Sequence, residues 1–123
     1  MKEFLLVFLG AGLGGALRFG IIRMMAQFVT ANYYSIFLCN MIGCFFAGII
    51  LSYALTKPDH NWINLFFITG LAGGLTTFSA FSLDSLNMIQ SGQIVTAFSY
   101  IMMSICLGII FCGAGIFLGR VIF

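Results

Sequence analysis

The residues whose types could do chemistry gather in one stretch, 70–81, near the middle of the chain. It combines glycines, hydroxyl side chains and aromatic rings within an apolar run that is long enough to cross a bilayer. A helix that faces lipid carries mostly Leu, Ile and Val, because a polar group in hydrocarbon must find a hydrogen-bonding partner. The stretch therefore indicates a break in a membrane helix.

Such a break would expose backbone groups that bind ions. Gly73 and Gly74 weaken a helix locally, and the side-chain oxygens of Thr76, Thr77 and Ser79 can cap a helix that restarts after them. In a bilayer the freed carbonyl and N–H groups must be buried in protein or line a water-filled cavity. Converging carbonyls suit a desolvated monovalent cation, whereas free N–H groups suit an anion. The stretch therefore predicts an ion pathway.

Phe78 and Phe81 follow the predicted break at a spacing of three residues, so a restarted helix presents both rings on one face. Ordinary packing explains any single Phe in a chain that has 15 of them. These two are singled out because they adjoin the break, and on that ground they are candidate pathway residues.

Polar residues in the other apolar runs are further candidates. Asn40 is either an interhelical contact or a pathway residue, because its amide must face a partner helix or a wet cavity. Arg18 either snorkels to the membrane surface or lines a polar vestibule. Tyr100 and Ser104 begin a stripe of small or polar residues at steps of four, which continues through 108 and 112 and should face the bundle interior.

The sequence offers no catalytic constellation. Asp84 has no assignable partner within the spans, and His60 stands alone in a predicted loop, where a metal or catalytic role is not expected. The cysteines lie inside apolar runs without CxxC spacing and are interpreted as packing residues. The chain is therefore not expected to be an enzyme.

Composition sets the elements that must position these residues. Of 123 residues, 62% are hydrophobic and 7% are charged, which indicates an all-α integral membrane protein without a soluble part. Runs of the roughly 20 residues needed for a span occur at about 4–22, 33–55, 62–89 and 94–117. Short connections join them. Residues 1–123 are therefore predicted to form a single four-helix transmembrane domain whose third helix is broken.

Charged residues are too few and too scattered to indicate a nucleic-acid partner. With four spans, both termini share a side with the second connection, and that side carries Lys2, Lys57 and Arg120. The other side carries Arg23 and, if it leaves the membrane, Arg18. This positive-inside bias is weak, so either orientation could insert.

Four short helices leave little room for a closed pathway inside one subunit. We therefore expect a dimer, which could be antiparallel, with small-residue faces at the contacts. Within the first run, Gly10 and Gly14 form a small-residue face that another helix backbone can approach closely.

Residues 73–81 closely resemble the GGxTTFSTF element of the CrcB/Fluc fluoride channels, with Ala80 where Thr is usual. Residues 14–18 resemble that family's first-helix motif, which ends in Arg, and 40–43 resemble its Asn-x-x-Gly motif. Chain length, four spans and weak charge bias agree over the whole chain. The chain is identified from these motifs as a member of that family.

The resemblance implies a fluoride channel of the cell (plasma or inner) membrane, which passively exports fluoride and so lowers its cytoplasmic level. It also implies an antiparallel, dual-topology dimer with two pores, formed by this chain alone or with a paired homologue. A central structural Na⁺ is expected on backbone carbonyls of Gly73 and Thr76 from both subunits. The residues expected along the fluoride pathway are Asn40, Phe78, Phe81, Thr77, Ser79, Tyr100, Ser104 and Arg18.

Two other classes remain as alternatives. A small four-span, dual-topology exporter of the multidrug kind would be expected to use an intramembrane carboxylate. The first span has none, because Glu3 lies at its very start. A non-transporting assembly subunit would need only glycine-rich faces, which leaves the break and Asn40 unexplained.

Overall fold

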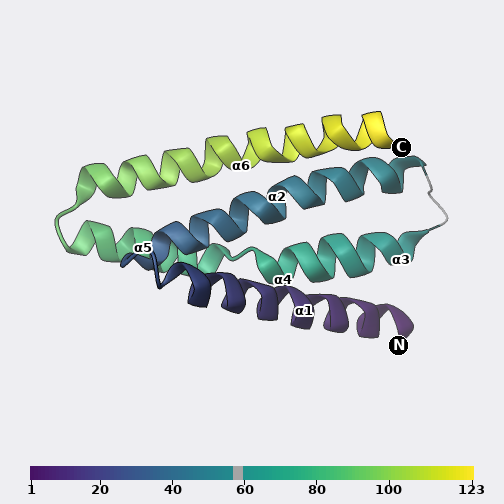
Figure 1. Cartoon of the computed structure of the whole chain (residues 1–123), viewed down its shortest axis with the longest axis horizontal. Helices are drawn as coiled ribbons and strands as arrows, with labels where there is room; N and C mark the ends of the chain where they lie inside the picture. Colours follow the sequence, from purple (N-terminus) through teal and green to yellow (C-terminus); the bar gives the residue numbers. More distant parts are fainter. Residues whose placement is uncertain (57–59) are drawn as a thin grey trace.

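The computed structural model describes residues 1–56 and 60–123, which are helical apart from short connections (Figure 1). No strand occurs within these described ranges. Among the described residues, four helical segments are long and apolar enough to cross a membrane, namely Lys2–Met25, Asn32–Thr56, Asn61–Gln90 and Ile94–Ile122. The prediction of an all-α, four-span membrane protein is therefore confirmed. Lys57, assigned to the second connection, lies outside the described residues.

Three of the spans are single helices: α1 (Lys2–Met25), α2 (Asn32–Thr56) and α6 (Ile94–Ile122). Each begins or ends beyond the predicted apolar run, because polar residues at a helix end can continue the helix into the membrane surface. Gly92 has a φ of 76° in the turn between the third and fourth spans. This left-handed conformation favours glycine, which explains the tight reversal there.

The third span consists of several pieces, in the order α3 (Asn61–Ile63), η1 (Asn64–Ala72), α4 (Gly73–Leu75) and α5 (Phe78–Gln90). The segment η1 is a π-helix, a wider helix in which each N–H bonds the carbonyl five residues back. Between α4 and α5 the chain leaves the helical conformation altogether (Figure 1). The prediction of a broken third helix is therefore confirmed.

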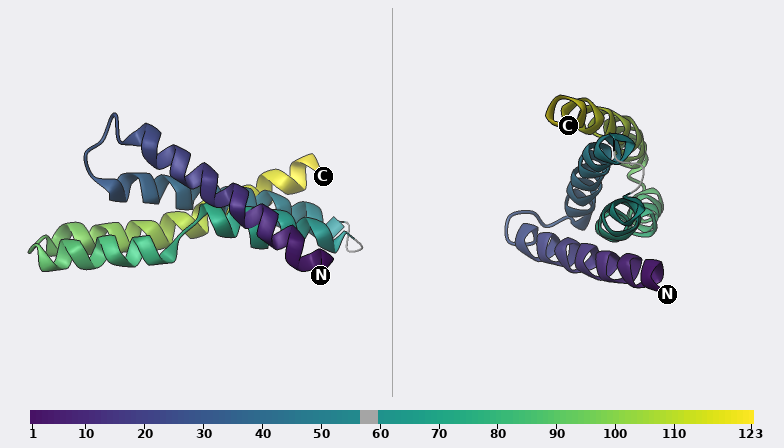
Figure 2. Two further views of the ribbon diagram at one scale, coloured as in Figure 1. Left: turned by 90° about the horizontal axis from the view of Figure 1, so that it is seen from below. Right: turned by 90° about the vertical axis from the view of Figure 1, so that its right-hand side faces the viewer.

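Two helix pairs form the subunit: α6 lies along α2, and α1 lies obliquely across η1 and α4 (Figure 2). Glycines allow the first pair to approach closely. A Cβ at Gly48 would meet the Cys112 carbonyl, and a Cβ at Gly115 would meet the Phe45 carbonyl. A Cβ at Gly108 would lie 3.7 Å from the Cys44 sulfur. The stripe predicted on the fourth span therefore faces α2.

The contact of α1 with the third span also depends on glycines. A Cβ at Gly10 would meet the Phe66 carbonyl, and one at Gly14 would meet the Leu71 carbonyl. The predicted small-residue face of the first helix thus packs within the subunit, where it brings α1 close to the segment that precedes the break.

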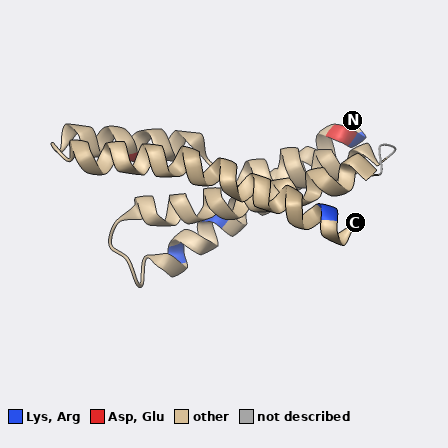
Figure 3. Ribbon diagram, turned by 90° about the horizontal axis from the view of Figure 1, so that it is seen from above, with Lys and Arg blue, Asp and Glu red and all other residues tan. Residues whose placement is uncertain are grey.

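The outer surface is apolar and carries few charges (Figure 3). Large hydrophobic side chains point outward along the helices, including Phe4, Val95 and Phe117, each more than 70% exposed in the single chain. Such a surface requires lipid or another protein around it. Both termini lie at the same end of the subunit (Figure 1), as an even number of spans requires.

Candidate ion site at the helix break

The break lies at Thr76 and Thr77. Thr76 has a ψ of 156° and Thr77 has φ and ψ of −151° and 117°, so both are extended between α4 and α5. Gly73 and Gly74, in contrast, remain in α4. The break thus begins after the glycine pair to which the sequence assigned it.

The two glycines differ in what surrounds them. A Cβ at Gly74 would meet the backbone of Ala11 on α1, so Gly74 permits close helix packing. A Cβ at Gly73 would have only the Ile68 carbonyl nearby, at 3.7 Å, and Gly73 is exposed. Gly74 therefore serves the contact with α1, and Gly73 lies on an open side of the subunit.

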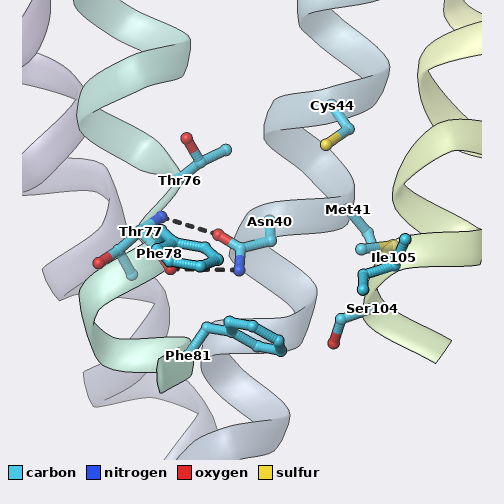
Figure 4. A pocket seen from close by; sticks show the side chains of 9 residues that line it. All are labelled: Asn40, Met41, Cys44, Thr76, Thr77, Phe78, Phe81, Ser104 and Ile105. Carbon is cyan, nitrogen blue, oxygen red and sulfur yellow. Dashed lines mark hydrogen bonds between the residues drawn. The ribbon is translucent and has the colours of Figure 1, made fainter. Parts of the chain in front are cut away.

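Side chains from two other helices bind the backbone of the break. Arg18 on α1 donates from Nη1 to the Thr76 carbonyl oxygen over 3.1 Å. Asn40 on α2 accepts the Thr77 N–H at Oδ1 over 2.8 Å and donates from Nδ2 to the Thr77 carbonyl over 3.4 Å (Figure 4). These bonds satisfy groups that an unbroken helix would have paired internally.

The helix restarts with the side-chain cap that the sequence predicts. Thr77 is the N-cap of α5, and its hydroxyl oxygen accepts the Ala80 N–H over 3.3 Å. The hydroxyl groups of Thr77 and Ser79 lie 3.1 Å apart and share a hydrogen bond. On the next turns, Ser82 and Ser85 donate to carbonyls one turn back, so these two hydroxyls are bound to their own helix.

An open hollow of about 260 Å³ adjoins the break. It brings together several residues that the sequence singled out, with further walls from α2 and α6. Figure 4 shows the Asn40 amide and the Phe78 and Phe81 rings directed into one space, with Ser104 across from them. The lining residues are Asn40, Met41, Cys44, Thr76, Thr77, Phe78, Phe81, Ser104 and Ile105.

The aromatic rings form a short row. The ring centroids of Phe78 and Phe81 are 5.6 Å apart, and those of Phe81 and Tyr100 are 5.3 Å apart. Phe78 is 79% exposed in the single chain, whereas Tyr100 is 7% exposed. The row therefore runs from an open edge of the subunit at Phe78 into its core at Tyr100.

Four of the predicted site residues do not line the hollow: Gly73, Arg18, Ser79 and Tyr100. Arg18 binds the break from α1, and Ser79 supports the cap of α5. Tyr100 packs behind Phe81. The Tyr100 hydroxyl and the Ser104 hydroxyl are buried and have no hydrogen-bond partner among the described residues.

Some site features carried no signal in the sequence. Met41, Cys44 and Ile105 form the apolar wall of the hollow, and their residue types do not distinguish them from packing residues elsewhere.

Asp84 lines a separate polar hollow of about 190 Å³ near the turn between α5 and α6. One of its carboxyl oxygens is buried without a partner in the described part of the chain.

The backbone at the break also has the chemistry of a cation site. In an unbroken helix the Thr77 N–H would bond the Gly73 carbonyl, but here it donates to Asn40. The Gly73 carbonyl is thus left without its α-helical donor. The Thr76 carbonyl keeps one of its two lone pairs beside the Arg18 bond. Carbonyl oxygens such as these fit a hard monovalent cation.

Comparisons with known proteins show the family to which the chain belongs. The family model described as CrcB-like protein, Camphor Resistance (CrcB), matches residues 5–116. Fluoride-specific ion channel FluC of Flavobacterium psychrophilum is 37% identical over 123 residues, which cover 98% of each chain. The protein of the same name from Phocaeicola vulgatus is 40% identical over 98% of this chain and 100% of its own. A third, from Helicobacter acinonychis, is 38% identical over 94% of this chain. The chain therefore belongs to the CrcB family.

Proposed function

We propose that this chain is a passive fluoride channel of the cell membrane. Its relatives over nearly the whole chain carry the name fluoride-specific ion channel, and its four apolar helices make it a multi-pass membrane protein. The observation that carries the proposal is the hollow at the break, where an amide, a hydroxyl and two phenylalanine rings meet. The function is transport of an ion, not catalysis.

The hollow supplies hydrogen-bond donors in place of water. Fluoride is small and strongly hydrated, so a pathway must offer donors to replace its shell. The Thr77 N–H holds Asn40 Oδ1, and Asn40 Nδ2 donates one N–H to the Thr77 carbonyl, so the second Nδ2 N–H remains for an ion. Ser104, whose hydroxyl has no partner in the described residues, is a second donor. The N-terminus of α5 adds partial positive charge.

Phe78 and Phe81 offer an anion their ring edges. An aromatic ring is positive at its edge, so it attracts an anion weakly without the full charge that would trap it. Passage requires binding that is strong enough for entry and weak enough for exit. Two rings 5.6 Å apart provide adjacent weak contacts of this kind.

The proposal includes a second copy of the chain. In one subunit the hollow is open and Phe78 is 79% exposed, so a closed pathway needs another surface across it. An antiparallel dimer, of this chain or with a paired homologue, would contain two such pathways. Carbonyls of Gly73 and Thr76 from both subunits would hold a structural Na⁺, which would neutralise their partial negative charge where the copies meet.

Ion flux from liposomes tests the function. Purified protein reconstituted with internal fluoride should release it passively down its gradient, and matched liposomes with chloride should retain nearly all of it. Ion-selective electrodes measure both. Folded, dimeric protein that passes no fluoride would exclude the proposed function.

Phe81→Ile tests the site within the same assay. We expect this variant to lose most of its flux, because isoleucine fills the space but has no positive ring edge. Phe98→Ile on α6 is the matched control, since Phe98 is 65% exposed and outside the hollow. It should conduct as the unmodified chain does. Equal flux in both variants would reduce Phe81 to a packing residue.

A further inference from the structure

Arg18 and Asn40 hold opposite ends of the same peptide bond. The Thr76 carbonyl and the Thr77 N–H belong to one planar unit. Arg18 on α1 donates to this carbonyl over 3.1 Å, and Asn40 on α2 accepts this N–H over 2.8 Å. The peptide plane in the middle of the break is thus fixed from both sides by helices that are far from it in the sequence.

The Thr76 carbonyl needs a donor that its own helix does not supply. In an unbroken helix it would accept the Ala80 N–H, but that group donates to the Thr77 hydroxyl oxygen. An unpaired carbonyl at membrane depth is costly. A guanidinium makes a charge-assisted bond, which is stronger than a bond between neutral groups. Arg18 therefore fills a structural requirement of the break.

The charge of Arg18 is directed at the backbone and not at the hollow. Arg18 is half-buried and absent from the lining of that space. Asn40, by contrast, both lines the hollow and takes its orientation from the Thr77 N–H. Any rotation of the clamped peptide would turn this N–H and thereby turn the Asn40 amide.

We propose that Arg18 is a positioning residue of the channel: it locks the Thr76–Thr77 peptide plane and so sets the direction of the Asn40 donor without lining the pathway. This inference rests on the proposed channel function. It differs from the expectation that Arg18 belongs to the pathway itself, where its charge would attract the anion directly.

Arg18→Lys and Arg18→Gln separate the two roles. Lysine keeps the positive charge but replaces the planar fork with a single ammonium of different reach, whereas glutamine removes the charge. Arg23→Lys and Arg23→Gln are matched controls on the same helix, because the Arg23 guanidinium lies over the Phe19 ring, 5.9 Å from its centroid. The two readouts are fluoride flux from liposomes and hydrogen exchange at the Thr77 amide.

We expect both Arg18 variants to speed Thr77 exchange and to lower flux by roughly tenfold or more, in line with the loss of one hydrogen bond to a charged group. Both Arg23 variants should leave exchange and flux unchanged. The proposal is overturned if Arg18→Lys retains protection and flux while Arg18→Gln and Arg23→Gln lose flux in parallel, because that pattern reports charge attraction. If the unmodified chain passes no fluoride, the channel function fails, but Thr77 exchange still decides the clamp.

A third variant covers the case in which neither Arg18 replacement folds. Arg18→Ala is purified in the presence of methylguanidinium. This small cation can enter the space left by the truncated side chain and donate hydrogen bonds with the same planar group as arginine. Restored protection at Thr77 with methylguanidinium, and none with methylammonium at equal concentration, is the expected result. Equal restoration by the two cations would contradict a geometric role for the fork.

Discussion

Asn40 contacts the backbone of Thr77 with both ends of its amide, and the two contacts use different atoms. Asn40→Asp keeps an acceptor for the Thr77 N–H and removes the N–H donors. We therefore expect this variant to keep the break formed, with normal protection of the Thr77 amide from exchange. Its fluoride flux should fall strongly, because the amide donor is gone.

Asn40→Ala is the companion variant, since it removes the acceptor and the donors together. It should lose both Thr77 protection and flux. Undiminished flux in Asn40→Asp would mean that the Asn40 amide only supports the break and gives nothing to the ion.

The structure brings several of the predicted site residues together, but the sequence could not orient all of them. Asn40, Phe78, Phe81 and Ser104 were predicted together, and all four line one hollow. Asn40 and Ser104 are polar residues in apolar spans, and Phe78 and Phe81 adjoin the break. The sequence alone shows both features. Arg18 points to the Thr76 carbonyl, which lies 58 residues further along the chain. The residue spacing within the first span cannot predict a contact between two such distant segments.

Glycines at the crossing of α1 with the third span are required by close packing. A Cβ at Gly74 would meet the Ala11 backbone, which cannot move as a side chain can. Gly74→Ala should therefore destabilise the folded protein by roughly 1 to 3 kcal/mol, the usual cost of overpacking. Thermal unfolding in detergent measures this change.

Gly12→Ala is the control, because a Cβ at Gly12 has nothing within 4 Å. On the same helix α1 it should be neutral or slightly stabilising, since alanine favours helix more than glycine does. If the two substitutions destabilise the protein equally, contact with Ala11 is not the cause of the Gly74→Ala effect.

The helices were predictable where hydrophobicity alone defines them. They were less predictable where packing determines the position of a break or the type of helix. Long apolar runs located all four spans. The glycine pair suggested the site of the break, but α1 keeps Gly74 in a helix, and the chain first becomes extended at Thr76. The π-helical form of η1 carried no signal, because a uniformly apolar segment has no periodicity that distinguishes five-residue from four-residue bonding.

The single subunit is incomplete as a pathway and as a surface. Its hollow is open, Phe78 is 79% exposed, and large apolar side chains cover the outside of the helices. Lipid can cover most of such a surface. A lipid-facing opening cannot conduct a hydrated anion, however, because the donors along it would face hydrocarbon. The second copy proposed above would lie against the open side of the break and supply the missing wall of the pathway.

Sparse charge at the two ends predicts how the copies insert. The end with the termini carries Lys2 and Arg120, and the opposite end carries Arg23. Because this difference is small, about half of the chains should insert in each orientation.

Cysteine labelling measures the orientation. Ser91→Cys lies at the exposed turn after α5 and His60→Cys lies at the other end, so the two variants report the two sides of the membrane. A membrane-impermeant maleimide applied to intact cells should label about half of each variant if orientation is mixed. The unmodified chain, with its four cysteines within the spans, gives the background. Complete labelling of one variant and none of the other would establish a fixed orientation and contradict an antiparallel homodimer.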